Sequence, residues 1–423
     1  MSDRCCVTPA CRRWSISLES NTWKAKAMSD RMRRREFLVE SGRAALSFSL
    51  LPLVRHPQRN RQPISAEREE TRLWETLIKD LERQIPKWMQ ETRVPGLSIA
   101  IIKDAKLGWR RGFGVKDNAS KESVNNNTMF EAASQSKPVF AYVVMKLCEK
   151  GVMNLDTPLT KYTSERFLEG DPRLDLITAR HVLSHTSGFP NWRSEKQPLK
   201  IHFTPGEKFL YSGEGYSYLQ SVVTHLTGHV NLKDCARYED GLKVCATDIE
   251  AYIKANLFVP FQMASSGYVW KNTLARRMAR PHDQSGKPID NKKSTLASVA
   301  RYGSAGALLT TPTDYAKFVI EVIDPKQGDA FRLNRDSVKE MLRPHVKIEG
   351  GKYPASWALG WQIFHNKNRD FIYHGGDSDG FHCCAVASVE GKSGFVVMTN
   401  GENGPGILKN LIMWNLMQEF LGS

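Results

Sequence analysis

Residues 130–151 read FEAASQSKPVFAYVVMKLCEKG, and this stretch decides how the rest of the chain is interpreted. Ser134 and Lys137 form the sole Ser-x-x-Lys of the sequence. The residues after this pair have the apolar spacing of a helix that ends at Gly151, so the pair lies where a helix begins. Residues three apart share one face of a helix, and we therefore expect the ammonium group of Lys137 beside the hydroxyl of Ser134.

Such a pair predicts nucleophilic catalysis. A serine hydroxyl is a weak nucleophile until a base takes its proton, and a lysine can do so once burial lowers its pKa. The free N–H groups and the dipole at the helix start would stabilise negative charge on a reacting oxygen. The alternative interpretation is a serine cap followed by a surface lysine, and the motif alone does not separate the two.

A second serine also lies in a motif that is known from hydrolases. Residues 376–380 read GDSDG, a literal G-x-S-x-G centred on Ser378. A nucleophile elbow joins a strand to a helix, and its catalytic acid and histidine follow in the chain. The residues after Ser378 alternate and are rich in valine, as in a strand, and the one later histidine is His382. We interpret this segment as a junction between a strand and a turn, with Ser378 outside the chemistry.

Strand patterns gather at the two ends of the chain. Two apolar runs within residues 96–117 flank Asp104, Ala105 and Lys106, which predicts a hairpin, and a helical spacing precedes them at residues 74–89. Further strand-like segments lie near the C-terminus, before a final amphipathic helix: 357–364, 371–376, 381–390 and 394–401. Two strands alone are marginally stable, so the hairpin needs the C-terminal strands as partners. The sequence predicts an α+β fold: one antiparallel sheet from both chain ends with flanking helices, and a mainly helical insertion.

Two further motifs accompany the Ser-x-x-Lys. Tyr211-Ser212-Gly213 follows a Pro-Gly turn and precedes an apolar helix, and His374-Gly375-Gly376 lies on a late strand. With residues 177–190 and 303–318 between them, these motifs make the chain resemble the serine β-lactamase and penicillin-binding-protein family. It is most similar to the branch that contains class C β-lactamases, D-aminopeptidases, DD-peptidases and carboxylesterases. The resemblance runs from about Trp74 to the C-terminus.

The resemblance implies a domain organisation and a fold. Residues 1–63 would be an export signal and linker, and residues 64–423 a single catalytic domain of β-lactamase/transpeptidase-like fold. The sheet half would comprise residues 64–133 and 345–423, and the helical half residues 134–344.

It also implies roles for individual residues. Ser134 would be the acylated nucleophile and Lys137 its activating neighbour. Tyr211 would shuttle a proton, with the charge of Lys137 making its phenolate accessible. The oxyanion hole would be formed by the backbone N–H groups of Ser134 and Asp377. Gly375 and Gly376 would let the substrate lie against the strand edge.

Two departures from the family pattern bear on the substrate. Gly213 stands where the second motif usually reads Tyr-x-Asn, so an amide that would hold an acyl-amide group is missing. His374 stands where Lys-Thr-Gly is common, and a histidine is mostly neutral near pH ~7. We therefore expect an exported serine hydrolase acting on an ester or amide in a small molecule or short peptide. The alternatives are a β-lactamase or DD-carboxypeptidase, and a low-activity penicillin-sensing or scaffold module.

Charge and leader patterns concern location and partners. Residues 1–63 carry a surplus of eight of the fifteen net positive charges, which leaves a mildly basic remainder without a basic block. We therefore expect no nucleic-acid partner. Arg34 and Arg35 precede a weakly apolar stretch that resembles a twin-arginine export signal, which predicts a periplasmic or extracellular protein. A basic disordered tail is the other interpretation of this segment.

The remaining features predict neither a cofactor nor a membrane span. His181 and His185 have the spacing of a helical zinc pair but no glutamate between them, so we expect packing or capping roles and no metal. Cys235 and Cys245 bracket a charged stretch and would close a disulfide loop in an oxidising compartment. Beyond the leader, no run approaches the ~18 apolar residues of a membrane span. Four aromatic residues either line a substrate site or fill the core: Phe189, Trp192, Tyr216 and Tyr218.

Overall fold

The computed structural model describes residues 66–164, 166–193, 198–228, 246–269, 274–290, 303–351, 353–366 and 369–412. The twin-arginine-like segment, Cys235 and Cys245 lie outside these residues. The chain divides into two compact units, Met1–Thr76 with Gly350–Lys352, and Leu77–Glu349 with Tyr353–Ser423. The described part of the first unit is mainly the beginning of helix α2 (Ala66–Thr92), and the strands and the other described helices belong to the second unit. The domain boundary predicted at residue 64 stays a prediction.

The second unit is built on an eight-stranded antiparallel sheet with the order β2-β1-β10-β9-β8-β7-β6-β5. Its neighbouring strands β1 and β10 come from opposite ends of the chain and pair from Leu97 with Thr399 to Ile102 with Gly394. The predicted sheet from both chain ends is therefore confirmed. The strands are β1 (Gly96–Lys103), β2 (Lys106–Gly114), β5 (Val346–Ile348), β6 (Ala355–Trp357), β7 (Gln362–Phe364), β8 (Phe371–Ser378), β9 (Phe381–Ser388) and β10 (Ser393–Thr399).

The hairpin β1–β2 follows from its turn residues and its apolar pattern. Asp104 and Ala105 both have positive φ, 51° and 52°, as a two-residue hairpin turn of primed type requires. Strand β1 is buried along nearly its whole length, whereas β2 is largely exposed except at Phe113. The edge strand β2 therefore carries the polar residues and the interior strand β1 the aliphatic ones.

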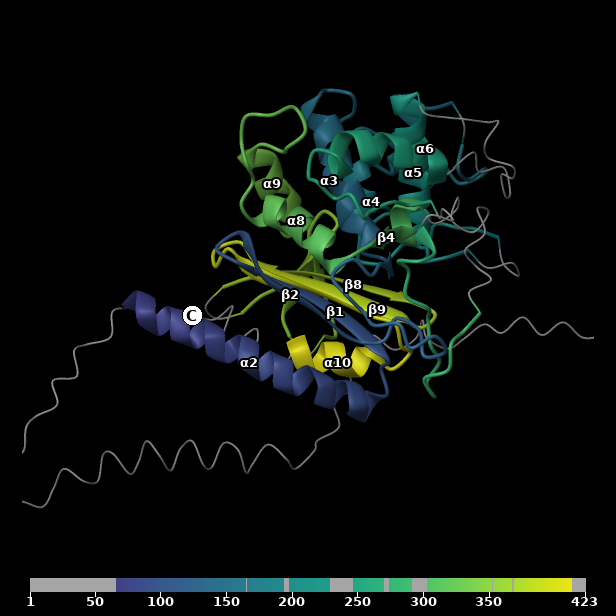
Figure 1. Cartoon of the computed structure of the whole chain (residues 1–423). Coiled ribbons are helices and arrows are strands. Elements are labelled where there is room, and N and C mark those ends of the chain that lie inside the picture. The colour runs from purple at the N-terminus through teal and green to yellow at the C-terminus, as the bar shows by residue number, and fades with distance from the viewer. Residues whose placement is uncertain are drawn as a thin grey trace, which may run out of the picture. The chain divides into compact units, whose positions relative to one another are not determined.

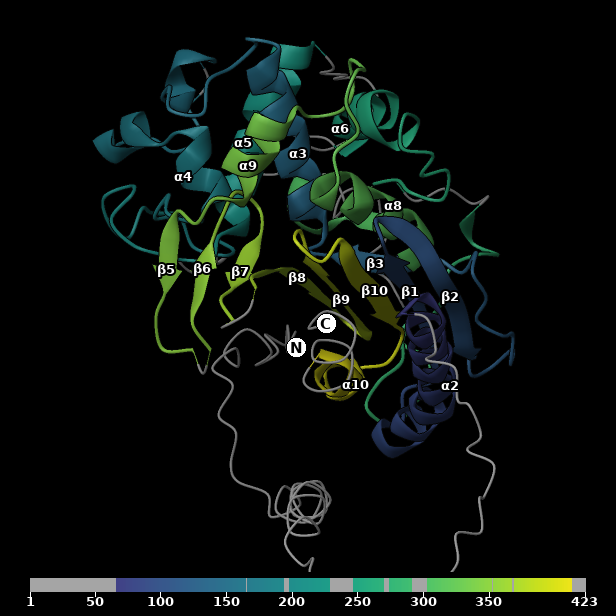
Figure 2. The ribbon, with the colours of Figure 1, turned by 90° about the vertical axis from the view of Figure 1, so that its left-hand side faces the viewer.

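Helices cover both faces of the sheet (Figure 1 and Figure 2). Helix α8 (Pro312–Ile323) packs against β1 and β10 on one face, and the short helix α10 (Gly404–Asn410) packs against β9 on the other. Helix α3 (Ser136–Glu149) is apolar nearly all round and is buried within the helical layer, as such a composition demands. The other helices of the insertion are α4 (Ala179–Leu183), α5 (Gly213–Thr227), α6 (Ala246–Ile253) and α9 (Arg335–Leu342), with short turns at Leu159–Lys161, Pro172–Leu176 and Lys254–Phe258.

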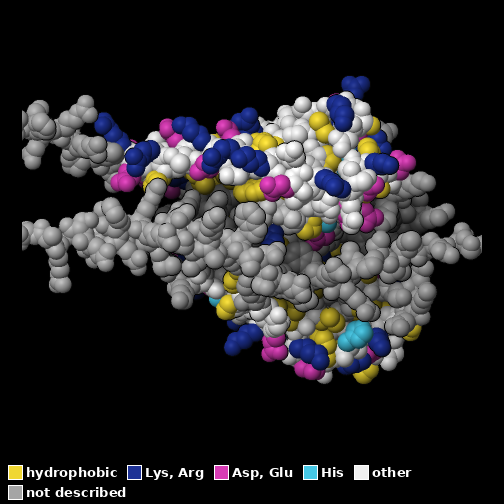
Figure 3. All heavy atoms as spheres, turned by 90° about the horizontal axis from the view of Figure 1, so that it is seen from below, with side chains coloured by type: hydrophobic (Ala, Val, Ile, Leu, Met, Phe, Trp, Pro, Cys, Tyr) yellow, Lys and Arg dark blue, Asp and Glu magenta, His cyan; other side chains and the backbone are white. Residues whose placement is uncertain are grey.

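Helix α2 shows how the predicted helical period places an apolar stripe. Leu81, Ile85 and Met89, each four residues apart, are buried, while the residues between them are exposed or half-buried. Where Figure 3 shows described residues, basic and acidic side chains are interspersed. No helix within the described ranges combines the length and the apolar content that crossing a bilayer requires.

The chain also forms a second, two-stranded sheet. Strand β3 (Phe130–Ala133), which we assigned to the sheet half at residues 64–133, pairs with β4 (Leu308–Thr310) of the helical half. The register shifts between Glu131 and Ala133, so the strand is irregular as it approaches Ser134. Periodicity alone could not assign β3, because a four-residue strand is too short to show which neighbour it pairs with.

Strand β8 lies so close to the end of β3 that a side chain at Gly376 has no room. A Cβ there would stand 2.2 Å from the carbonyl oxygen of Ala132, whereas at Gly375 it would meet the flexible tip of Tyr373 at 2.6 Å. We predict that Gly376→Ala lowers the free energy of unfolding by about 1–3 kcal/mol. Gly375→Ala should cost less than half as much, because a side-chain tip can move and a backbone oxygen cannot. Urea unfolding of both variants measures this, and equal losses would contradict the proposed contact.

Candidate active site

Ser134 lies in a tight, strained turn between β3 and α3. The residue before it, Ala133, has φ 44°, a left-handed conformation that is uncommon for a residue with a side chain. The turn is fixed by the side chain of Ser136, which donates to the Ala133 carbonyl at 2.6 Å and accepts from the Leu308 amide at 2.9 Å. Ser134 itself is partly exposed, whereas its neighbours Ala133 and Gln135 are buried.

Lys137 is fully buried in the first turn of α3, and its amine faces Ser134. Its Nζ donates to Ser134 Oγ at 3.2 Å and to the carbonyl oxygen of Ala305 at 2.7 Å. Nζ also lies 4.7 Å from the ring centre of Tyr211. Burial lowers the pKa of Lys137 to about 7, so near neutral pH a large fraction of the amine is uncharged. The structure thus brings the predicted pair together and excludes the surface-lysine interpretation.

Tyr211 comes from the segment before α5 and points toward the same two groups. Burial raises the pKa of its phenol, and a hydrogen bond with Ser134 only partly offsets this. We expected the charge of Lys137 to make the phenolate accessible, and that expectation is wrong. Burial favours the protonated phenol, so Tyr211 keeps its proton at neutral pH, whereas the pKa of Lys137 lies near 7.

His185 packs against Tyr211, a contact that we did not predict. The two rings lie 4.2 Å apart at 35°, and His185 Nδ1 accepts from the Ser212 amide at 3.0 Å. Burial lowers the pKa of His185 well below its usual range, so the ring is neutral. Its own backbone is left-handed, with φ 57°. The expected packing role is therefore confirmed, but the partner of this histidine is the phenol of the site.

Strand β8 offers a free edge beside Ser134. Its pairing with β7 ends at Tyr373, so residues 374–378 are paired only with β9. Alternate residues of an antiparallel strand direct both backbone groups to the same side. The carbonyl of Gly375 accepts from His374 Nδ1, while that of Gly376 contacts Cys383 of β9. Gly375 and the residue two further on, Asp377, therefore face the unpaired edge.

The side chain of Asp377 is committed elsewhere. Its carboxylate contacts His382 Nδ1 at 2.6 Å across the ladder, on the opposite face from Gly376. The backbone N–H of Asp377 is thereby left for the site without competition from its own carboxylate.

His374 is buried, neutral and held in one tautomer. Its Nδ1 lies 2.6 Å from the Gly375 carbonyl, so this nitrogen carries the proton and Nε2 presents a lone pair. Nε2 is buried without a hydrogen-bond partner. Burial, with a smaller contribution from the charge of Lys137, lowers the pKa of His374 to about 3. The group that stands in place of the family's lysine is therefore an acceptor and not a cation.

Gly213, the first residue of α5, lies directly against the indole of Trp192. A Cβ on Gly213 would stand 2.4 Å from two ring carbons of Trp192. The same indole lies 5.9 Å from Lys137 Nζ and is partly exposed. Of the four aromatic residues whose place was left open, Trp192 is partly exposed near Lys137, and the other three are fully buried: Phe189, Tyr216 and Tyr218.

Two of the sequence candidates lie outside this constellation. Ser378 is on β8 and donates to Glu131 at 2.9 Å, and the chain continues into β9, as a strand and turn should. His181 closes the capping box of α4 with Thr178. In the ranges that the structure describes, no three His, Cys, Asp or Glu side chains are placed to hold a metal ion.

The three motifs therefore meet at one place in this fold, and the family profile agrees with them. The profile of the beta-lactamase family matches residues 78–414. The chain belongs to the beta-lactamase family. Solved structures of the same fold include an octameric penicillin-binding protein homologue from Pyrococcus abyssi, with a TM-score of 0.65, 22% identity and coverage of 81% of this chain and 79% of that one. The D-alanine carboxypeptidase AmpC from Burkholderia cenocepacia has a TM-score of 0.62 and 18% identity, with coverage of 80% of this chain and 99% of that one.

Curated proteins from other organisms are also similar in sequence. Protein flp of Staphylococcus aureus strain N315 is 23% identical over 365 residues, which cover 81% of this chain and 67% of that protein. Its counterpart in strain MRSA252 is 23% identical over 347 residues, which cover 76% of this chain and 63% of that protein. This beta-lactamase family member thus spans roughly two thirds of the length of these relatives.

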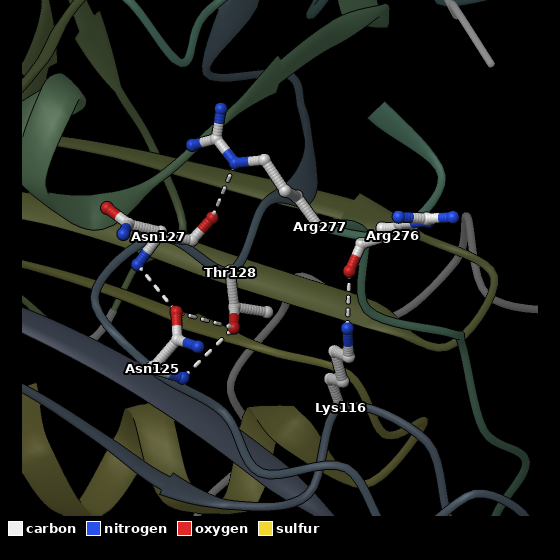
Figure 4. Close-up of a pocket in the computed structure, with 6 residues that line it drawn as sticks. All are labelled: Lys116, Asn125, Asn127, Thr128, Arg276 and Arg277. Atoms are coloured by element: carbon white, nitrogen blue, oxygen red, sulfur yellow. Dashed lines mark hydrogen bonds between the residues drawn. The ribbon is translucent and has the colours of Figure 1, made fainter. Parts of the chain in front are cut away.

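A separate cavity of about 260 Å³ shares no residue with this site (Figure 4). It is lined by Lys116, Asn125, Asn127, Thr128, Arg276 and Arg277. Two of its three cationic groups already have protein partners. The Lys116 amine donates to the Arg276 carbonyl and pairs with Glu122, and Arg277 Nε donates to the Asn127 carbonyl at 3.2 Å.

The burial of Lys137 predicts an effect on stability that depends on pH. We predict that Lys137→Met, which keeps the straight-chain shape, raises the melting temperature by a few degrees at pH 6 and by less at pH 9. The sign follows from the lowered pKa of Lys137 in the folded protein. Below about pH 7 the buried amine is protonated in both states, and its charge destabilises the folded state in full. This destabilisation decreases as pH rises from about 7 toward 10.5, the pKa in the unfolded chain.

Lys146 on the same helix is the matched control for this measurement. Its amine pairs with Glu149 at 2.7 Å and donates to the Arg332 carbonyl at 2.6 Å. Lys146→Met should therefore not raise the melting temperature. A fall of the same size for both variants at both pH values would contradict the account of Lys137.

Proposed function

We propose that this chain is a serine hydrolase of the Ser-x-x-Lys type that cleaves an ester or amide through an acyl-enzyme on Ser134. The observation that carries the proposal is the buried amine of Lys137, whose pKa is lowered to about 7 and which lies 3.2 Å from the hydroxyl of the partly exposed Ser134. A group with that pKa can take the hydroxyl proton and return it at neutral pH. Membership of the beta-lactamase family supports the same chemistry.

The proton steps follow from the pKa order of the site. The uncharged amine of Lys137 accepts the proton of Ser134 as Oγ attacks the carbonyl carbon. Negative charge develops on the carbonyl oxygen, where the N–H groups of Ser134 and Asp377 would stabilise it. Tyr211, still protonated, donates to the departing alcohol or amine and regains its proton from Lys137. A water molecule then repeats the sequence on the acyl-enzyme and releases the acid.

The substrate is proposed from what the site lacks. Recognition of a D-alanine carboxylate or a penicillin carboxylate favours a permanent cation, and the corresponding position holds the neutral His374. An acyl-amide group favours a side-chain amide, and Gly213 has none. Both features support an ester or a simple amide, as in the carboxylesterase and D-aminopeptidase members that the sequence resembles. A β-lactamase or DD-carboxypeptidase remains the alternative, and export remains a proposal from the sequence.

The serine assignment is tested by covalent labelling. We predict that a fluorophosphonate adds one adduct to the intact protein, that Ser134→Ala abolishes the adduct, and that Ser378→Ala retains it. The reason is that Lys137 activates Oγ of Ser134, whereas Ser378 is bound to a carboxylate. Intact-protein mass spectrometry measures the adduct in wild type and in both variants. Full labelling of Ser134→Ala would place the nucleophile elsewhere, and no labelling of any form would favour the low-activity module.

The substrate class is tested by comparing two chromogenic compounds. We predict that kcat/KM for a short-chain p-nitrophenyl ester exceeds that for nitrocefin, because nothing at His374 or Gly213 recognises the carboxylate or the acyl-amide of a β-lactam. Ser134→Ala serves as the blank for both reactions. Faster turnover of nitrocefin would instead support the β-lactamase alternative.

A further inference from the structure

The segment that carries Trp192 is fastened to the first turn of α5. The carbonyl of Asn191 accepts from the amides of Gly213 and Glu214 at 2.9 and 3.0 Å, and its side-chain oxygen accepts again from Gly213 at 3.1 Å. The first amides of a helix have no partner within the helix. Asn191 therefore caps α5 from a distant segment of the chain, and it fixes the backbone just before Trp192.

The residue after Trp192 is anchored as firmly. Arg193 binds the Glu214 carboxylate through its backbone amide at 2.7 Å and through its guanidinium at 2.9–3.1 Å. The Glu214 side chain is 1% exposed and that of Arg193 15%. A bidentate pair of this kind fixes direction as well as distance. Trp192 is thus held between two anchors that both end on the first turn of α5.

The indole fills the space that Gly213 leaves. Two carbons of its six-membered ring stand 2.4 Å from where a Cβ of Gly213 would be, so any larger residue at 213 requires Trp192 to move. The ring also lies 5.9 Å from Lys137 Nζ, and part of it is exposed. A fixed apolar surface therefore stands where the family's second motif places an amide.

We propose that Trp192 is the specificity-determining residue of this site and that it selects substrates with a flat apolar acyl group over those with an acyl-amide. The inference rests on the proposed acyl-enzyme at Ser134 and adds to it the class of acyl group. An aromatic acyl group gains stacking and apolar contact on the indole. An acyl-amide loses hydrogen bonds there, because an indole ring face offers neither a strong donor nor a strong acceptor.

The test compares acyl groups at a constant leaving group. The measured quantity is the ratio of kcat/KM for p-nitrophenyl phenylacetate to kcat/KM for p-nitrophenyl acetate. We expect this ratio to be about 10- to 100-fold lower in Trp192→Ala than in wild type. Trp192→Phe should keep the ratio within about threefold. Trp192→Gln should also lose the preference for the phenylacetyl group. Because glutamine fills more of the space than alanine, this variant keeps the test valid if Trp192→Ala does not fold. Phenyl and p-nitrophenyl acetates, which vary the leaving group, should respond alike in all variants.

A paired substitution tests the contact with Gly213. Gly213→Asn alone should lower the melting temperature and all ester hydrolysis, because its Cβ would stand 2.4 Å from the indole and 2.7 Å from the Asn191 carbonyl oxygen. Trp192→Ala combined with Gly213→Asn removes the clash with the indole but not the one with the Asn191 carbonyl oxygen, so it should restore folding only in part. The double variant should raise kcat/KM for p-nitrophenyl N-acetylglycinate relative to p-nitrophenyl butyrate, whereas neither single variant should.

The outcomes separate the two proposals. If wild type is labelled at Ser134 and hydrolyses esters, but Trp192→Ala and Trp192→Gln leave the acyl ratio unchanged, the specificity role is wrong and the proposed function stands. A change that follows the leaving group and not the acyl group would also overturn it. If wild type shows neither labelling nor ester hydrolysis, the proposed function fails and this inference fails with it.

Discussion

The structure depends on one buried amine. Lys137 has no carboxylate among the contacts described, only the Ser134 hydroxyl, the Ala305 carbonyl and surrounding aromatic rings. An ammonium group is costly in such surroundings, and the result is a pKa near 7 instead of near 10.5. That cost is also what makes the amine useful, because an exposed lysine would stay protonated and could not take a proton. The left-handed residues Ala133 and His185 flank the same group, which is consistent with strain being retained where function requires it.

The remainder of the fold excludes solvent from this amine and holds its partners within contact distance. Helix α3 is apolar on nearly every face and buries Lys137 in its first turn, while the small sheet β3–β4 fixes the turn at Ser134. Tyr211 arrives from the start of α5 and is steadied by the ring of His185. Strand β8 supplies the free edge, and the missing Cβ of Gly376 lets it approach β3. Four segments far apart in the sequence thus meet around one side chain.

Much of this could be predicted from the sequence, for reasons that differ by feature. The sheet from both chain ends followed from alternating patterns at the two termini, and the Ser134–Lys137 pair followed from a local helical spacing. The pairing of β3 with β4 could not, because such short strands carry no register signal. A glycine at 213 shows that a side chain is absent but not what replaces it, so Trp192 remained ambiguous until its neighbours were placed. The expectation that the charge of Lys137 makes the Tyr211 phenolate accessible was wrong, because the pKa of Tyr211 depends on burial, which the sequence spacing does not reveal.

The most direct test of the account is the pKa of Lys137 itself. It can be measured by following the ¹³Cε resonances of labelled lysines with pH in the intact protein, with Lys137→Met identifying the resonance. The account predicts one lysine resonance with a midpoint near pH 7, and this resonance should be absent from the variant. A Lys137 midpoint near 10.5 would contradict it, because the amine would then be protonated throughout the neutral range and unable to activate Ser134.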